Sequence, residues 1–348
     1  MLEERSYKKI DHPSAWIGET LQNSDVWLTE LTDEQIAELD TALVSVKAQE
    51  IGAQQINPEN FVLPEFGGTL HNLAKDIESG RGFCLIRGLP LDRWGEADSA
   101  LVYFGISSYL GQAVSQNRKG QILVPIRNTG RSAADPDARG PETNAEGSYH
   151  SDFADIVGLM CMCPAKEGGI SRICSSIAIY NKMVDEGRTD LIDALFAGYP
   201  FYRKNEQKPG LPAYSQAPIP MLSVFDQILS FRVISGWSRM AAETSGIPWS
   251  DIQAEAADFI ETTARDPKYH LNMGFKVGDV QFLNNYAVLH SRTGYTDYPE
   301  PERRRFLQRI WLKAHLGRTL AEDFDHLFGP ESTREGIPGW EEANSAGA

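Results

Sequence analysis

The chain has 348 residues and a formal net charge of −15, from 33 Lys and Arg against 48 Asp and Glu. Phosphate backbones and anionic lipid head groups repel a protein this acidic. We therefore expect neither nucleic acid nor membrane as a partner. No run approaches the roughly 18 apolar residues of a membrane span, and the N-terminus lacks the apolar stretch of a signal peptide. We therefore expect a cytoplasmic protein.

The first hundred residues predict two helices and a strand. Residues 31–48 begin with a capping box formed by Thr32 and Gln35, and their apolar residues recur at helical spacing. A second helix of the same pattern ends near Gly80, and residues 83–87 form an apolar run that predicts a strand. This part supplies scaffold.

A helix followed by a strand is predicted again over residues 97–110. The chain then turns polar from Arg127 to Ser148, and a loop of this length inside a domain is typically a lid or a disordered insertion. Both interpretations stay open.

Short strands dominate the remainder and predict an all-β core with flanking helices. The expected strands cover residues 157–163, 171–174, 221–224, 229–233, 280–283 and 305–312. One helix is expected, over residues 250–265, and a polar, frayed tail after Phe328. Because no linker is visible, we expect a single domain over residues 1–348, with its core at about 82–314 and the tail at about 329–348.

The four cysteines occur without a C-x-x-C pair, and each lies in an apolar or alternating stretch. They are Cys84, Cys161, Cys163 and Cys174. Four cysteines are too few for a disulfide scaffold. We therefore expect them to be reduced and packed as small apolar side chains.

The candidate chemistry starts at His150-Ser151-Asp152. In an extended segment, residues i and i+2 point to one side, so an imidazole and a carboxylate could hold one metal ion. With seven histidines and this many acids, about one such H-x-D/E motif occurs by chance, so the partners must carry the argument. Two histidines and one carboxylate form the open site of non-haem Fe(II) oxygenases. His290, at the end of an apolar run, is the favoured second histidine, and His270, in an expected turn, is its competitor.

A third element is the strand that follows residue 304. Its alternation places Arg305, Leu307, Arg309 and Trp311 on one face. Arginines in a strand that otherwise looks buried need anionic partners, and a guanidinium binds a carboxylate through two hydrogen bonds. A solvated edge strand is the alternative interpretation.

Taken together, these segments resemble the taurine dioxygenase family of Fe(II)- and 2-oxoglutarate-dependent oxygenases. The resemblance runs from about Gly82 to Leu312. Its motifs are Gly82-Phe83-Cys84-Leu85-Ile86-Arg87-Gly88, Leu110-Gly111-Gln112, His150-Ser151-Asp152, Pro164 with Gly168-Gly169-Ile170-Ser171, His290, and Arg304-Arg305-Phe306-Leu307-Gln308-Arg309. It implies a double-stranded β-helix, or jelly roll.

The resemblance also implies roles for single residues. His150, Asp152 and His290 would bind Fe(II), and Arg305 and Ser171 would bind 2-oxoglutarate. The expected reaction uses O2 to oxidise an unactivated C–H bond of a small-molecule substrate, by hydroxylation or desaturation, and releases succinate and CO2.

Arg309, Gln116, Asn117 and Tyr149 are the candidate substrate-binding residues. The segment after Gly111 lacks the histidine that would bind a sulfonate, so taurine is not expected as the substrate. The turn between His290 and Arg305 is several residues longer than expected for the taurine enzyme, so Arg304 and Arg309 stay open as alternatives to Arg305.

Two alternatives from other classes remain, along with an open question about assembly. A cupin-like Zn or Mn enzyme, a hydrolase or isomerase, could use the same ligands, but it gives no reason for Arg305 and Ser171. A non-catalytic binding protein with a degenerate site is disfavoured by the intact ligand set. A homodimer stays open.

Overall fold

The computed structural model describes residues 7–131, 142–325, 327–328 and 333–340. Its centre is a large mixed sheet with the strand order β1-β2-β11-β5-β14-β3-β15, in which β4 also pairs with β14. Only the β1–β2 and β3–β15 pairs are parallel. The strands are β1 (Leu28–Glu30), β2 (Phe83–Arg87), β3 (Gly111–Gln116), β4 (Leu123–Ile126), β5 (Ile156–Cys163), β11 (Val280–Asn284), β14 (Phe306–Ala314) and β15 (Gly336–Ile337).

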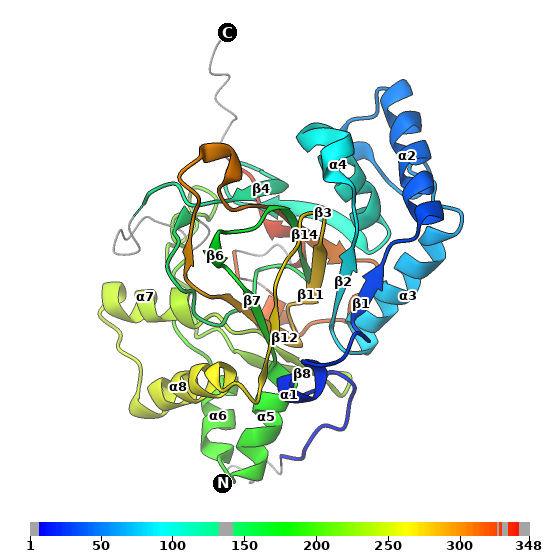
Figure 1. Ribbon diagram of the computed structural model, residues 1–348. Helices are drawn as coiled ribbons and strands as arrows, with labels where there is room; N and C mark the ends of the chain where they lie inside the picture. Colours follow the sequence, from blue (N-terminus) through cyan, green and yellow to red (C-terminus); the bar gives the residue numbers. More distant parts are fainter. Residues whose placement is uncertain (1–6, 132–141, 326, 329–332, 341–348) are drawn as a thin grey trace.

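A smaller antiparallel sheet lies across the large one, as Figure 1 shows for β7 and β12 in front of β11. It contains β10 (His270–Met273), β7 (Ser171–Ser175) and β12 (Val288–Arg292). Two short pairs flank it, β6 (Glu167–Gly168) with β13 (Tyr295–Thr296) and β8 (Leu222–Phe225) with β9 (Ile228–Phe231). The two sheets form the double-stranded β-helix that the sequence predicted.

Helices cover the outside of both sheets (Figure 1). The large sheet is covered by α2 (Asp33–Ala48), α3 (Phe66–Ser79) and α4 (Leu91–Ser108). Beside the small sheet lie α5 (Ser176–Asp185), α6 (Thr189–Ala197), α7 (Ser235–Ser245) and α8 (Asp251–Arg265). Two short helices are α1 (Gly18–Leu21) and α9 (Glu322–Asp325). None of the described helices is long and apolar enough to cross a bilayer.

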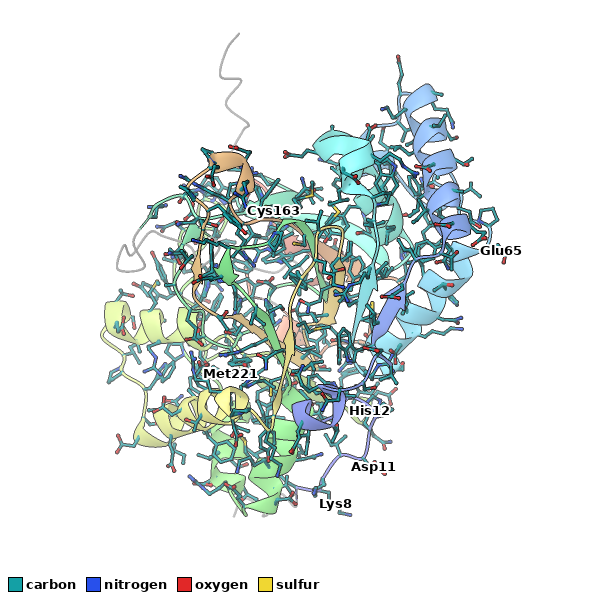
Figure 2. The ribbon with its side chains drawn as sticks, viewed as in Figure 1. Lys8, Asp11, His12, Glu65, Cys163 and Met221 are labelled. Carbon is teal, nitrogen blue, oxygen red and sulfur yellow. The ribbon has the colours of Figure 1, made fainter. Side chains whose placement is uncertain are left out.

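Strand alternation divides the interior into two cores. In β5, Ile156 and Met160 pack against the α2–α4 side, whereas Val157 packs toward the small sheet. In β14, Ile310 and Leu312 likewise face the helices. Side chains fill both spaces (Figure 2). Because side chains alternate across a strand, the odd-numbered residues of these two strands face the interior between the sheets.

The predicted elements agree with the structure in most places. The capping boxes at Thr32 and Ser250 are both present, and β2 covers exactly the residues expected for it, which confirms these elements. The expectation of one helix after residue 149 is wrong, because α5, α6 and α7 also lie there. Helices this short draw most of their stability from packing against the rest of the domain rather than from their own sequence.

The C-terminal tail departs from the sequence prediction. Residues 333–340 are ordered against the sheet: β15 pairs with β3, and Arg334 forms an ion pair of 2.8 Å with the buried carboxylate of Asp155. A frayed tail is therefore wrong for this stretch. Of the polar loop at 127–148, residues 132–141 lie outside the described part of the chain.

Cysteine packing agrees with the prediction for three of the four residues. Cys84, Cys161 and Cys174 are buried, Cys163 is partly exposed, and all four are free thiols. Burial raises the pKa of Cys84 and of Cys161 to about 12, so these thiols stay protonated and unreactive at neutral pH.

Candidate active site

A cavity of about 400 Å³ opens between the two sheets. Its wall includes the four alternating residues of the strand from Arg305, which confirms that they share a face. They are Arg305, Leu307, Arg309 and Trp311. The cavity also contains His150, Asp152 and His290.

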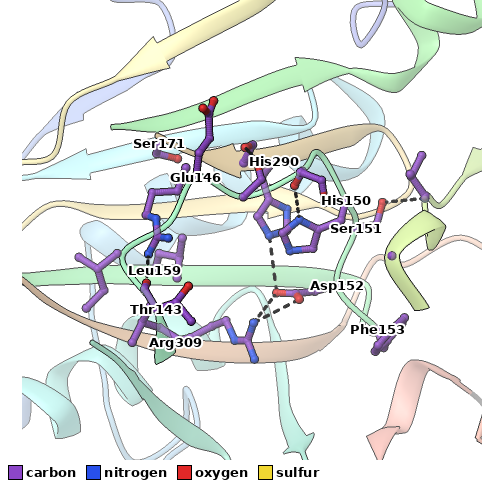
Figure 3. A pocket seen from close by; sticks show the side chains of 18 of the residues that line it. Thr143, Glu146, His150, Ser151, Asp152, Phe153, Leu159, Ser171, His290 and Arg309 are labelled. Carbon is purple, nitrogen blue, oxygen red and sulfur yellow. Dashed lines mark hydrogen bonds and ion pairs between the residues drawn. The ribbon is translucent and has the colours of Figure 1, made fainter. Parts of the chain in front are cut away.

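The three candidate metal ligands converge at the centre of this cavity (Figure 3). His150 and His290 come from segments far apart in the chain, joined by reciprocal backbone hydrogen bonds of 3.1 and 3.0 Å. One ligand atom from each of these histidines and from Asp152 lies within 4.8 Å of the others. Two imidazoles and one carboxylate at this separation are a donor set suited to a divalent transition metal.

The chemical state of each imidazole also suits metal binding. Nδ1 of His150 lies 2.9 Å from the carbonyl oxygen of Ser148, so Nδ1 is the donor of this hydrogen bond and Nε2 is the ring atom left to bind a metal. Burial, followed by the proximity of His150, lowers the pKa of His290 to about 3. His290 is therefore neutral at physiological pH, as a metal ligand must be.

Asp152 is held by two side chains from β14. Nη1 of Arg309 lies 3.2 Å from both carboxylate oxygens, and the indole N–H of Trp311 donates to Oδ2 at 2.9 Å. Burial alone would raise the pKa of Asp152, but the charge of Arg309, together with the Trp311 hydrogen bond, lowers it below its ordinary value. The protein itself therefore keeps this carboxylate ionised and oriented.

The backbone around Asp152 is fixed by Asn285, which belongs to none of the sequence motifs. Its side-chain oxygen accepts from the backbone N–H of Asp152 at 2.9 Å, and its Nδ2 donates to the carbonyl of Ala154. Asn285 is fully buried in the turn between β11 and β12. An Asn after a buried strand is a common turn signal, so no local pattern marked this role.

Arg305 and Ser171 lie in the same cavity, to one side of the three ligands. Arg305 is 4% exposed, and its Nη1 is buried with no hydrogen-bond partner among the described residues. Gly169 makes room for it, because a Cβ there would lie 3.0 Å from Nε of Arg305, and its φ of +66° favours glycine. A buried guanidinium that lacks a partner atom is suited to an anionic ligand.

A second arginine strengthens the positive charge on this side. The guanidinium groups of Arg292 and Arg305 both pack over the aromatic ring of Tyr295. Their central carbons lie 4.6 and 5.1 Å from the ring centre. Burial and the charge of Arg305 lower the pKa of Arg292 to about 10, so it remains protonated. Arg292 also donates to the carbonyl oxygens of Thr143 and Ala145, which fixes the rim of the cavity.

The opposite side of the ligands carries an aromatic wall, formed by Phe153, Trp237 and Trp311. The Phe153 ring packs edge to face with Trp237 at 4.9 Å and with Trp311 at 6.1 Å. Trp237 stacks on Phe201, and Phe328 packs behind Phe153 at 5.3 Å. Figure 3 shows Phe153 on the far side of Asp152 from Ser171 and Leu159. Sequence periodicity cannot find such a wall, because its three members come from three separate segments of the chain.

Three of the candidate substrate-binding residues are placed elsewhere. Gln116 is fully buried behind Arg309, the Asn117 side chain bonds Gln121, and Tyr149 packs near His270, and none of the three lines the cavity. The fourth candidate, Arg309, lines the cavity, and its guanidinium donates a hydrogen bond to the carboxylate of Asp152.

His270, the competing histidine, was expected in a turn and instead begins β10. It is buried, with Nδ1 3.1 Å from the carbonyl of Ala264, and it does not line the cavity. Its ring is therefore held by the backbone of α8 rather than presented to the other candidate ligands.

Known structures with a similar fold include two oxygenases. An asparagine oxygenase in complex with Fe(II), 2S,3S-3-hydroxyasparagine and succinate matches with a TM-score of 0.65 and 16% identity, over 82% of this chain and 93% of the other. The non-heme iron oxygenase OrfP in complex with Fe, succinate and (3S)-hydroxy-L-Arg matches with a TM-score of 0.61 and 14% identity, over 82% and 94% of the two chains.

Two curated proteins are similar in sequence. The FR-33289 synthase of Streptomyces rubellomurinus (strain ATCC 31215) is 27% identical over 316 residues, which cover 89% of this chain and 92% of the synthase. The taurine hydroxylase-like protein SAT17 of Stachybotrys chartarum is 27% identical over 334 residues, covering 92% and 85%. Residues 46–311 match the model of the taurine catabolism dioxygenase TauD, TfdA family. This match covers most of the chain, and the protein therefore belongs to the TauD/TfdA family of Fe(II)- and 2-oxoglutarate-dependent dioxygenases.

Proposed function

We propose that the cavity is the active site, in which His150, Asp152 and His290 bind Fe(II) while Arg305 and Ser171 bind 2-oxoglutarate. When bound there, Fe(II) and 2-oxoglutarate supply the oxidative chemistry, in which O2 is consumed, succinate and CO2 are released, and a C–H bond of a small organic substrate is oxidised. The observation that carries the proposal is the pairing of this ligand set with a buried arginine in one cavity.

The residues of the chain have distinct tasks in this proposal. Arg309 and Trp311 keep Asp152 ionised and oriented, so the carboxylate needs no rearrangement to bind the metal. Arg305 neutralises one carboxylate of the cosubstrate with a fixed guanidinium plane. The apolar walls exclude water from the reacting centre, which strengthens each of these charge interactions.

The aromatic wall favours a substrate with a hydrocarbon or aromatic portion. The two structural neighbours hold hydroxylated amino acids in their complexes. Here Phe153, Trp237 and Trp311 offer apolar surface on the side away from Arg305. Such walls bind by burying apolar area, so the substrate is expected to place a hydrocarbon group against Trp237.

The experiment that tests the metal and cosubstrate assignment is an anaerobic titration of the protein with Fe(II) and 2-oxoglutarate. Chelation of Fe(II) by the keto acid gives a visible charge-transfer band, and succinate, which lacks the keto group, is the matched control. We expect the band when Fe(II) and 2-oxoglutarate are both present and no band when succinate replaces 2-oxoglutarate. The Asp152→Ala variant should lose the band. A protein that binds Zn²⁺ and hydrolyses esters or amides without such a band would support the metallohydrolase alternative.

The substrate class is tested by a screen that follows succinate release above the substrate-free background. Compounds with an aromatic or branched hydrocarbon portion are expected to stimulate release. Trp237→Ala should raise the KM of a stimulating compound, while the matched variant Trp94→Ala, on α4 away from the cavity, should not. Stimulation by hydrophilic amino acids alone would contradict this substrate class.

A further inference from the structure

Gln116 ends β3 directly behind the proposed metal site and is fully buried. Its side-chain oxygen accepts a hydrogen bond of 2.7 Å from Nε of Arg309. Its Nε2 donates to the carbonyl oxygens of Arg309 at 2.8 Å and Ile122 at 2.7 Å. Because a guanidinium only donates and a carbonyl only accepts, this pattern fixes the orientation of the amide. Gln116 thus binds both the backbone and the side chain of Arg309.

Arg309 transmits this constraint to the candidate metal ligand. Its guanidinium is planar, so fixing Nε also fixes the position of Nη1. Nη1 lies 3.2 Å from both oxygens of Asp152. Gln116, Arg309 and Asp152 therefore form a continuous chain of hydrogen bonds, and each of the three residues is less than a tenth exposed.

We propose that Gln116 is a positioning residue for the metal site, which holds the Arg309 guanidinium that in turn holds the Asp152 carboxylate in its ligand orientation. This inference rests on the proposed function, in that it takes the three ligands to bind a divalent metal. It also gives Arg309 a role toward the metal ligand in place of the substrate contact expected from the sequence.

The need for such a device follows from where Asp152 lies. The residue belongs to a loop rather than to a strand, so no regular backbone pairing fixes the direction of its side chain. Arg309 lies in the middle of β14, the most extensively paired strand of the large sheet. Gln116 lies at the end of β3, beyond its ladder with β14, and bonds β14 through its side chain. The rigid sheet thereby orients a loop carboxylate.

The test is a Mn(II) titration followed by the loss of the EPR signal of the free ion. Gln116→Leu removes every hydrogen bond of the amide at similar volume. We expect it to weaken Mn(II) binding by about 10- to 100-fold, the usual effect of removing a group that orients a ligand. Gln116→Glu keeps an acceptor for Nε of Arg309 but sets its second carboxylate oxygen against the carbonyl oxygens of Arg309 and Ile122, so it should also bind Mn(II) more weakly than wild type. Gln112→Leu, the same change at an exposed position of β3, should stay within about twofold of wild type.

A double variant shows whether Gln116 acts through Arg309. If it does, Gln116→Leu combined with Arg309→Leu should bind Mn(II) no more weakly than Arg309→Leu alone. Fully additive losses in the double variant would overturn the proposal. Thermal unfolding of each variant separates weaker metal binding from a loss of fold.

The outcomes also separate this inference from the proposed function. If the wild-type protein binds neither Mn(II) nor Fe(II), the proposed function fails. If it binds and a folded Gln116→Leu binds equally well, only the role of Gln116 is overturned. Should Gln116→Leu fail to fold, Gln116→Asn keeps the amide but withdraws it from Arg309, and wild-type affinity in that variant would equally contradict the proposal.

Discussion

The indole N–H of Trp311 donates a 2.9 Å hydrogen bond to Oδ2 of Asp152, the oxygen that lies 3.8 Å from Nε2 of His290. Trp311 is 2% exposed and reaches Asp152 from β14, two residues beyond Arg309. The two strand residues thus donate to one loop carboxylate from the same face of the strand. An aromatic residue that looks like core packing in the sequence has a polar task in the structure.

We expect Trp311→Phe to keep most of the packing while it removes this donor. One carboxylate oxygen then loses its shortest hydrogen bond, and the affinity for Mn(II) or Fe(II) should fall by about tenfold. Metal titration by EPR or isothermal calorimetry measures the change. An unchanged affinity in a folded Trp311→Phe would show that the Arg309 contact alone orients Asp152.

Replacing any one of His150, Asp152 and His290 by Ala should abolish metal binding and succinate formation. His270→Ala is the matched histidine control, and it should retain metal binding because its ring does not line the cavity. The same variant should unfold at a lower temperature, since His270 is buried and bonds the carbonyl of Ala264. Loss of metal binding in His270→Ala with retention in His290→Ala would overturn the ligand assignment.

Arg305→Lys should raise the KM for 2-oxoglutarate with little change in the KM of the organic substrate. Lysine keeps the charge but loses the planar pair of donors, at a cost of about 1–3 kcal/mol, or a roughly 5- to 150-fold rise in KM. Ser171→Ala should act in the same direction more weakly. Steady-state succinate assays give these constants, with the exposed neighbour variant Arg304→Lys as the control. An effect confined to the organic substrate would move the cosubstrate role to another arginine.

The metal-free protein should lose stability as the pH falls below about 6.5. Burial lowers the pKa of His270, and that of His290 to about 3, whereas both titrate near 6.5 in the unfolded chain. The unfolded state therefore binds more protons than the folded state in this range, so stability falls as the pH falls, by up to about 1.4 kcal/mol per pH unit for His290. For His290 the loss continues until the pH approaches about 3.

Urea unfolding of the metal-free protein at pH 7.5, 6.5 and 5.5 measures how the free energy of unfolding depends on pH. These pH values lie above the pKa values of most carboxyl groups, so few carboxyl groups titrate in this range. His270→Gln and His290→Gln should each reduce the slope of unfolding free energy against pH. If the slope in both variants equals that of wild type, other groups carry the pH dependence.

The sequence alone determined the local elements with strong periodicity and capping. The helix from Asp33 and the strand Phe83–Arg87 are encoded by neighbouring residues, so local patterns sufficed to place them. The ordered motifs likewise placed His150, Asp152, His290 and Arg305 in one family pattern. Spacing along β14 correctly placed its alternate residues on one face, because side-chain direction in a strand depends only on the parity of the position.

Only the tertiary structure decided what these side chains contact. Gln116 and Arg309 were expected to bind substrate, and in the structure a chain of hydrogen bonds between β3 and β14 links both of them to Asp152. Asn285 fixes the Asp152 backbone, and Phe153 meets Trp237, across segments that are distant in sequence. Such partners are set by sheet pairing and loop packing between remote segments, and a one-dimensional pattern carries no signal of them.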